Sequence, residues 1–261
     1  MDSNLKTVVR FPRLKRLVGS IICCNLFGRF IGFVYRDRIP FNGGRIDVNG
    51  VRVPPKNKAL LFWGLYESSE YRYVRDYLLP DLPTIELGSS IGAISSQIAK
   101  RLRTNTLLIC VEGNPRVQSV LQRNLAANAS HLSTQVVNAV VAYGRKQIAF
   151  GLSDDNLSSY IDREQSDVVE VQIPTVQLAE LVKSLPEPRY QLVADIEGAE
   201  AAILVHDAES LLNCQRVIIE LHATQFEGNT FSVDDLCSKF HAIGFRTLAQ
   251  YGPVAVFEKN K

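Results

Sequence analysis

Cysteine is scarce in this chain of 261 residues, and its five cysteines do not form the pattern of a disulfide scaffold or a metal site. Their number is odd, no Cys-x-x-Cys pair occurs, and Cys110 lies inside an apolar run. These features favour a reducing compartment over a disulfide-rich secreted fold. The four histidines show no zinc-ligand spacing. The sequence therefore predicts a cytoplasmic protein without a zinc site.

The chain also lacks an apolar run that could span a membrane. Its most apolar stretch, residues 17–35, is interrupted by Ser20, Asn25 and Arg29, whereas a spanning helix needs about 20 apolar residues. No small-residue cleavage site follows a continuous apolar core, which argues against a secretory signal. Two interpretations remain: a helix that packs on the main domain, which we favour, or a helix that lies on the inner surface of a membrane.

A strong net charge is absent as well, but the charge is unevenly distributed. The chain carries +2 in total, while residues 1–38 hold eight basic and only two acidic residues. A basic segment beside an apolar stretch suggests contact with an anionic surface, so peripheral membrane contact through residues 1–38 stays an alternative. The rest of the chain is mildly acidic, which argues against a nucleic-acid partner.

Short apolar runs alternate with amphipathic segments from residue 84 onward. The expected strands are residues 84–87, 106–111, 135–142, 190–195 and 216–221, and the expected helices are 91–102, 115–128, 175–185, 199–212 and 233–243. This alternation predicts an α/β fold with a parallel sheet and helices on both faces. A terminal antiparallel hairpin is expected at 245–249 and 254–258, and extra strands of an insertion at 146–152 and 168–173.

Upstream of the sheet the pattern is different. Residues 45–53 alternate around Asn49-Gly50, which predicts a hairpin with a type I′ turn. Residues 66–79 have helical spacing. We therefore divide the chain into an N-terminal basic and apolar segment with its hairpin, residues 1–55, and a main domain, residues 56–261.

The first strand of the main domain runs directly into Gly88-Ser-Ser-Ile-Gly92, and a helix follows at once. Gly88 lets the chain turn tightly and lets a ligand approach the backbone, and Gly92 lets the helix pack close to the strand. The spacing is neither the G-x-G-x-x-G of a dinucleotide site nor a phosphate-binding loop. The loop thus fits a ligand without a pyrophosphate, although an ordinary strand–helix turn is the alternative.

Two carboxylates stand beside this loop. Glu112 ends the second strand, and an acid in that place accepts hydrogen bonds from the two hydroxyls of a ribose. Glu86 lies within an apolar run, where a carboxylate needs a partner. The ammonium group of a bound amino acid would be such a partner.

Three motifs resemble those of the FkbM family of methyltransferases: Glu-Leu-Gly-Ser-Ser-Ile-Gly at 86–92, Val-Glu-Gly-Asn-Pro at 111–115 and Asp-Ile-Glu-Gly-Ala-Glu at 195–200. The last is the most specific, and Tyr66-Glu67 and Thr175-Val-Gln-Leu resemble further family features. The resemblance covers residues 62–245. It implies a class I, Rossmann-like methyltransferase fold with a mostly parallel seven-stranded sheet, S-adenosyl-L-methionine as cofactor, and methylation of a hydroxyl on a sugar or natural product. Val193 departs from the family, which often has lysine there.

The resemblance also implies roles for individual residues. Glu86, Gly88 and Gly92 would line the methionine part of the cofactor, Glu112 would hold the ribose, Asn138 and Ala139 would lie near the adenine, Asp195 would lie beside the sulfonium, and Tyr66 and Glu67 would close over the amino-acid end. Ser89, Ser90 and Asn114 complete the expected cofactor-binding set.

Methyl transfer from a sulfonium needs orientation of the acceptor and a base for its proton. The base candidates are Asp195, Glu197, Glu220 and His222, of which we rank Asp195 first and His222 second. Glu197 could instead favour the start of a helix, and His222 could be structural. Asp195 and Glu197 could share a divalent metal, but two carboxylates are weak support, and no metal site is predicted.

The acceptor stays open among a saccharide, a glycolipid and a natural product, and so does the oligomeric state. A nucleic-acid methyltransferase is the alternative enzyme, but amino-group methylation of bases usually uses an Asn/Asp-Pro-Pro-Tyr/Phe loop where this chain has Asp-Ile-Glu-Gly. A non-catalytic cofactor-binding module is the alternative outside enzymes. Such a module would lose the acids at the strand ends, whereas Glu86, Glu112 and Asp195 are all present.

Overall fold

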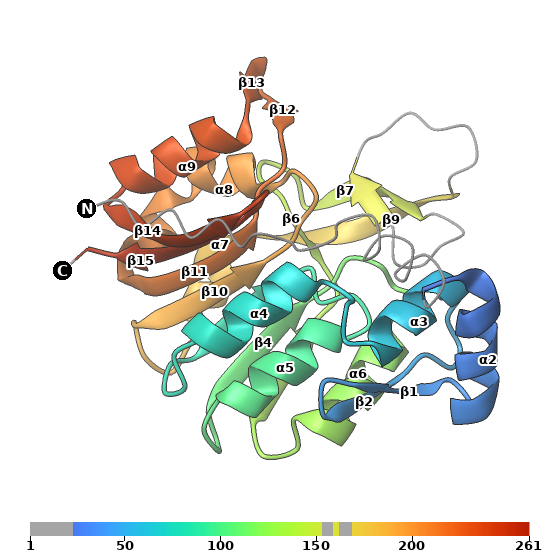
Figure 1. Cartoon of the computed structure of the whole chain (residues 1–261). Helices are drawn as coiled ribbons and strands as arrows, with labels where there is room; N and C mark the ends of the chain where they lie inside the picture. The colour runs from blue at the N-terminus through green and yellow to red at the C-terminus, as the bar shows by residue number, and fades with distance from the viewer. Residues whose placement is uncertain (1–22, 153–158, 162–168, 261) are drawn as a thin grey trace, which may run out of the picture.

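A seven-stranded sheet forms the centre of the computed structural model, which describes residues 23–152, 159–161 and 169–260 (Figure 1). Its order is β14-β15-β11-β10-β3-β4-β5, and β15 alone runs opposite to the other strands. The strands are β3 (Thr84–Leu87), β4 (Leu107–Val111), β5 (Ser133–Val137), β10 (Tyr190–Ala194), β11 (Cys214–Glu220), β14 (Phe245–Tyr251) and β15 (Val254–Lys259). The predicted mostly parallel sheet with a C-terminal antiparallel hairpin is confirmed.

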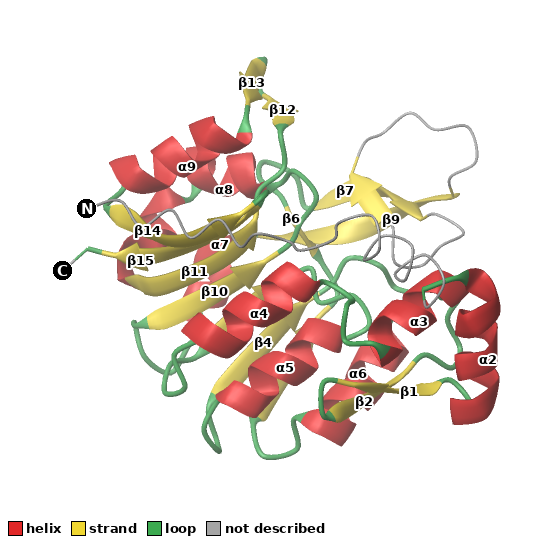
Figure 2. Ribbon diagram, in the orientation of Figure 1, coloured by secondary structure: helices red, strands yellow, loops and turns green. Residues whose placement is uncertain are grey.

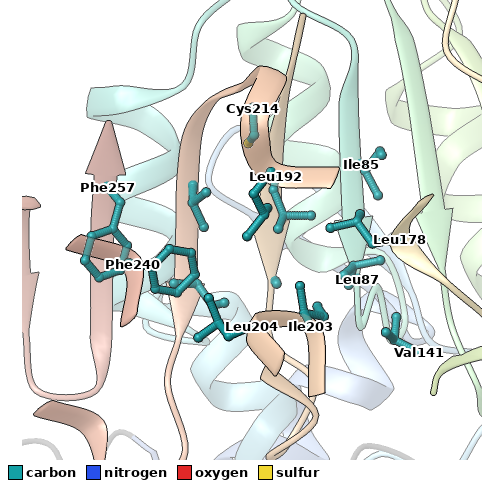
Figure 3. Close-up of a cluster of buried hydrophobic side chains, with 14 of the residues drawn as sticks. Ile85, Leu87, Val141, Leu178, Leu192, Ile203, Leu204, Cys214, Phe240 and Phe257 are labelled. Atoms are coloured by element: carbon teal, nitrogen blue, oxygen red, sulfur yellow. The ribbon is translucent and has the colours of Figure 1, made fainter. Parts of the chain in front are cut away.

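Helices cover both faces of this sheet (Figure 2). One face carries α4 (Ser68–Tyr77), α5 (Ala93–Arg101) and α6 (Gln118–Asn128), and the other carries α7 (Leu178–Lys183), α8 (Glu200–His206) and α9 (Val233–Ala242). Successive side chains of a strand point to opposite faces, so Ile85 and Leu87 pack beside Leu192 and Ile203 in the second layer (Figure 3). The central strands β3, β4 and β10 are mostly apolar because both of their faces are buried, whereas the outer strands β5 and β14 carry exposed polar residues.

The N-terminal elements are α2 (Asn25–Tyr35), β1 (Arg38–Phe41), β2 (Gly44–Asp47) and α3 (Pro55–Phe62). α2 packs closely on α3 through Gly28, where a Cβ would lie 1.7 Å from the carbonyl oxygen of Pro55. Residues 25–35 therefore form a helix that packs on α3, which leaves the membrane alternative untested, while residues 1–22 lie outside the described ranges. None of the helices in those ranges combines the length and the apolar character that crossing a membrane requires.

The predicted hairpin turn at Asn49-Gly50 is wrong. β1 and β2 pair around Asn42-Gly43, with Ile39 opposite Ile46. Both Asn-Gly pairs supply turn residues, but this register buries Ile39 and Ile46 completely. Burial of these apolar side chains, rather than the turn residues alone, selects the register.

Asn124 of α6 joins this hairpin to the main domain. Its Oδ1 accepts a hydrogen bond from the amide of Asp47 at 2.8 Å, and its Nδ2 donates to the carbonyl oxygens of Asp47 and Ile91 at 2.9 and 2.8 Å. Ile91 belongs to the glycine loop after β3. The hairpin, the loop and α6 are thus held by one buried amide, and the division of the chain at residue 55 stays a prediction.

Most predicted elements begin or end at slightly different residues in the structure, and three of these differences have a clear cause. The strand expected at 135–142 is divided into β5 and β6 (Val140–Val141) because Asn138 donates to the carbonyl oxygens of Glu112 and Gly113 and leads the chain out of the sheet. The helix expected from residue 175 begins at Leu178, since β9 (Val169–Val176) continues to residue 176. The helix expected at 199–212 is α8 followed by a 3₁₀ turn, Ala208–Asn213.

The insertion forms a separate four-stranded sheet in the order β6-β9-β7-β8, with β7 (Gln147–Leu152) and β8 (Ser159–Ile161). The extra strands expected there are confirmed. Several short elements were not predicted, among them α3, β8 and two further strands. These two, β12 (Thr224–Phe226) and β13 (Asn229–Phe231), pair with each other outside both larger sheets.

Candidate active site

The glycine loop after β3 lies where the ends of β3 and β10 approach each other. Gly88 has a φ of 85°, and a Cβ there would lie 1.8 Å from the carbonyl oxygen of Asp195. Only glycine fits such a contact. Gly92 has a φ of 80°, and a Cβ there would lie 3.0 Å from the side chain of Leu121 of α6. Ser90 also has a left-handed φ of 47°, a conformation that costs energy in a residue with a side chain.

Glu112 closes this loop from the end of β4. Its Oε2 accepts the amide hydrogen of Ser90 at 2.7 Å, and its Oε1 accepts that of Asn114 at 2.7 Å. Burial raises the pKa of Glu112, and the two backbone amides oppose the rise. Each carboxylate oxygen keeps a further lone pair. The side chain is thus fixed in place with acceptor capacity to spare, as a ribose site requires.

Asn138 and Ala139 follow β5 on the same edge of the sheet. Asn138 Nδ2 donates to the carbonyl oxygens of Glu112 at 2.8 Å and of Gly113 at 3.1 Å. Gly113 was not identified from the sequence. A Cβ there would lie 2.3 Å from the side chain of Val140, so this close approach requires glycine. The structure therefore brings the expected ribose and adenine positions together.

Glu86 has partners within the protein. Its side chain is buried, and its Oε2 accepts hydrogen bonds from the hydroxyl of Ser95 at 2.5 Å and from the thiol of Cys110 at 3.2 Å. Burial raises the pKa of Glu86, and these donors oppose the rise. Ser95 was not identified from the sequence, because its position one turn into α5 gives no local signal of its partner.

Tyr66 and Glu67 precede α4 and face the same edge. Glu67 has a left-handed φ of 45°, and burial together with the charge of Asp195 raises its pKa to about 8. Burial and the charge of Glu67 raise the pKa of Tyr66 well above its ordinary value. Both side chains therefore lie within electrostatic reach of Asp195.

Four carboxylates surround one imidazole where β10 and β11 end side by side. His222 Nε2 lies 3.9 Å from Asp195 Oδ1, 3.6 Å from Glu197 Oε2 and 3.9 Å from Glu220 Oε1. On its other side, His222 Nδ1 lies 3.0 Å from Oε1 of Glu200. All four base candidates are thus neighbours. Glu200, which was not identified from the sequence, binds the other ring nitrogen of the imidazole.

The protonation of this cluster follows from its crowding. Burial and the charge of Glu220 raise the pKa of Asp195 to about 7, and His222 opposes the rise. Burial disfavours the protonated imidazole of His222, but Glu200 and the other carboxylates outweigh that effect and raise its pKa to about 9. At neutral pH His222 therefore carries a proton in the unliganded protein, whereas Asp195 is close to its midpoint and can accept one.

A hollow of about 190 Å³ adjoins the cluster. It lies between the start of α4 and the turn of the β14–β15 hairpin, and its wall includes Glu67, Glu220 and Tyr251. An acceptor molecule bound there would lie next to the strand-end carboxylates.

A family model described as the methyltransferase FkbM domain matches residues 88–247 of this chain. The match includes the glycine loop, Glu112 and the whole cluster around His222, but not Tyr66 or Glu67. A comparison with curated proteins found no match.

Several solved methyltransferase structures are similar at low identity. A Streptococcus pneumoniae protein, provisionally a tRNA methyltransferase and solved with S-adenosyl-L-methionine, is 14% identical, with a TM-score of 0.42 and coverage of 74% of this chain and 73% of its own. The ribosomal protein L11 methylase of Lactobacillus delbrueckii is 12% identical, with a TM-score of 0.43 and coverage of 75% and 80%. The precorrin-6y C5,15-methyltransferase of Geobacter metallireducens is 11% identical, with a TM-score of 0.41 and coverage of 75% and 87%.

Proposed function

Because this chain belongs to the FkbM family of methyltransferases, we propose that it transfers a methyl group from S-adenosyl-L-methionine to a hydroxyl oxygen of a saccharide, glycolipid or natural product. Methyltransferase activity and its methyl donor come with the family. The hydroxyl acceptor and the roles of single residues are our proposals. The observation that supports them most is Asp195, whose Oδ1 is buried without a hydrogen-bond partner beside the glycine loop.

In the proposed site the donor lies along the carboxyl ends of β3, β4 and β10. Glu112 accepts hydrogen bonds from the ribose hydroxyls, and Asn138 and Ala139 lie beside the adenine. The glycine loop with Ser89 and Ser90 follows the methionine part, and Tyr66 and Glu67 cover the amino-acid end. The cation of the donor would offset the surplus negative charge of the site, which is favourable where carboxylates are buried.

The reaction is an in-line displacement at the methyl carbon. The acceptor oxygen attacks as its O–H bond breaks, the proton passes to Asp195, and the carbon–sulfur bond breaks with its electron pair going to sulfur. A carboxylate with a pKa near 7 is suited to this task, because general bases work best near the operating pH. His222, held by Glu200, is the second candidate for the base, and it would have to lose the proton that it carries at neutral pH before it could act.

Nucleic acid is the alternative acceptor, and the charge of the site argues against it. Four carboxylates lie within hydrogen-bonding or ion-pair distance of His222 at the strand ends, and they would repel a phosphate backbone. Incubation with labelled S-adenosyl-L-methionine and matched panels of saccharides, glycolipids, hydroxylated natural products and RNA tests the proposal. A labelled methyl ether is expected in at least one of the saccharide, glycolipid and natural-product panels. Label in RNA alone would overturn the hydroxyl assignment.

We also propose that α2 contacts a membrane, which would place the chain at its cytoplasmic face. Leu26, Phe30 and Phe33 are 78, 58 and 84% exposed on this helix, and the arginines at 29 and 36 are exposed beside them. An apolar helix face flanked by basic residues suits an anionic lipid surface. This contact would also suit a glycolipid acceptor.

Sedimentation with anionic and with neutral vesicles tests the membrane contact. The double variant Phe30→Ser/Phe33→Ser should lose most binding to anionic vesicles. Leu212→Ser, at a leucine 59% exposed elsewhere on the surface, is the matched control and should bind like the unchanged protein. Equal sedimentation of all three proteins would remove the membrane contact and leave α2 as a packing helix.

A further inference from the structure

The cluster around His222 has the composition and spacing of a metal site. Asp195, Glu197 and His222 each offer one ligand atom, and these three atoms lie within 4.8 Å of one another. Two ligands of an ion with bonds of about 2.1 Å are about 3 Å apart at right angles and about 4.2 Å apart when opposite. The distances from His222 Nε2 to the two carboxylates, 3.9 and 3.6 Å, lie within that interval.

Buried oxygen atoms without partners form an independent sign that a ligand is needed. Glu200 has a fully buried side chain, and while its Oε1 meets His222, its Oε2 has no hydrogen-bond partner. Asp195 Oδ1, 3.9 Å from the same imidazole, is likewise buried and unpartnered. Buried carboxylate oxygens are costly unless hydrogen-bonded, paired or bound to a metal.

The charge of the cluster is also uncompensated. Within the described ranges, every ion pair of its four carboxylates leads to His222. One imidazolium offsets one negative charge, so a surplus remains at the ends of β10 and β11. A divalent cation would compensate it.

The imidazole is already oriented as a metal ligand. Glu200 accepts the Nδ1 proton at 3.0 Å, so a cation that displaces the Nε2 proton of the imidazolium meets a lone pair that faces the carboxylates. Histidines that bind metals usually donate their other ring N–H to a carboxylate or carbonyl in this way, and that partner fixes their tautomer.

We propose that Asp195, Glu197 and His222 bind a divalent cation, with Glu220 in reach as a fourth ligand. One imidazole among carboxylates suits manganese better than magnesium, which prefers oxygen ligands alone. Glu197, whose side chain is 52% exposed, can move to complete the coordination.

The role of the ion rests on the proposed function, whereas its binding does not. An acceptor hydroxyl bound at an open coordination position would lose its proton more readily, because the cation stabilises the alkoxide. Asp195 would bind the ion through Oδ1 and take the proton on Oδ2. The oxygen would then attack the methyl carbon, and the electron pair of the carbon–sulfur bond would leave with sulfur.

Titration of the chelator-treated full chain with Mn²⁺, followed by electron paramagnetic resonance of the free ion, tests the site. One Mn²⁺ per chain is expected. His222→Ala and Glu197→Gln should weaken its binding more than about tenfold, and Glu200→Gln should weaken it by about tenfold to a hundredfold, as for other groups that orient a ligand. His206→Ala is the matched control, because His206 forms an exposed pair with Glu227 at 2.7 Å, and it should bind Mn²⁺ normally.

Two results would overturn the site: no binding by the unchanged chain up to about 1 mM Mn²⁺, the weak limit of protein cation sites, or undiminished binding by His222→Ala. Calorimetry with S-adenosyl-L-methionine separates this inference from the proposed function. Donor binding without Mn²⁺ binding would remove only the metal site. Mn²⁺ binding without donor binding would contradict the proposed donor site and leave the metal site in place.

Discussion

Replacement of Glu112 by alanine should weaken binding of S-adenosyl-L-methionine by about 1.5–3 kcal/mol, the range for a lost hydrogen bond to a charged group. That corresponds to an increase in Kd of roughly tenfold to a hundredfold. The carboxylate also binds the amides of Ser90 and Asn114, both at 2.7 Å. A loss of affinity alone could therefore come from a loosened loop, and a second comparison is needed.

A double-mutant cycle with the ligand separates these two effects. S-Adenosylhomocysteine and its 2′-deoxy analogue are titrated calorimetrically against the unchanged protein and against Glu112→Ala. The unchanged protein should prefer the hydroxylated ligand by about 1.5–3 kcal/mol, and the variant should prefer it by less than about 0.5 kcal/mol, because the acceptor is gone. Thermal unfolding confirms that the variant is folded. Equal preference in both proteins would refute the ribose assignment, whatever the absolute affinities are.

Three further predictions concern the same edge of the sheet. Asp195→Asn should lower the rate of single-turnover methyl transfer by about 10²–10⁴-fold with little change in donor affinity. If Asp195→Asn instead turns over normally while His222→Ala is inactive, the imidazole is the base. Gly88→Ala should lower the free energy of unfolding in urea by about 2–4 kcal/mol, because its Cβ would meet the carbonyl oxygen of Asp195 at 1.8 Å; a change below about 0.5 kcal/mol would contradict that contact. Since the pKa of Glu67 is raised to about 8, and a cationic donor favours its charged form, donor binding should tighten from pH 6 to pH 9 and release protons. Calorimetry in buffers of different ionisation enthalpy measures this release, and an affinity independent of pH would count against Glu67 at the donor site.

The sequence predicted those parts of the site that depend on strand ends. Glu112 and Asp195 each end or follow a strand of a parallel sheet, and the carboxyl ends of such strands meet at one edge. The strand–helix alternation was sufficient to predict a parallel sheet, and hence one edge at which these ends meet. That Asp195 lies beside the glycine loop also depends on the order of the strands, and it was predicted from the family resemblance.

Partners that depend on how a helix is rotated against the sheet were not predictable. Ser95 of α5 binds Glu86, and Glu200 of α8 binds His222, yet neither pair has a fixed spacing in the sequence. The hairpin register failed for a related reason. Two Asn-Gly pairs offered similar turns, and the choice depended on the burial of Ile39 and Ile46 in the tertiary structure.

The buried side-chain amide of Asn124 links two segments that are far apart in the sequence, the N-terminal hairpin and the glycine loop. It binds Asp47 of the hairpin and the carbonyl oxygen of Ile91 in the glycine loop at the same time. A shift of the hairpin that disturbs this amide must also change the environment of the loop, and the converse holds. Coupled binding equilibria are reciprocal. If a molecule that binds the hairpin changes the affinity of the protein for the methyl donor by some factor, the bound donor changes the affinity of the protein for that molecule by the same factor.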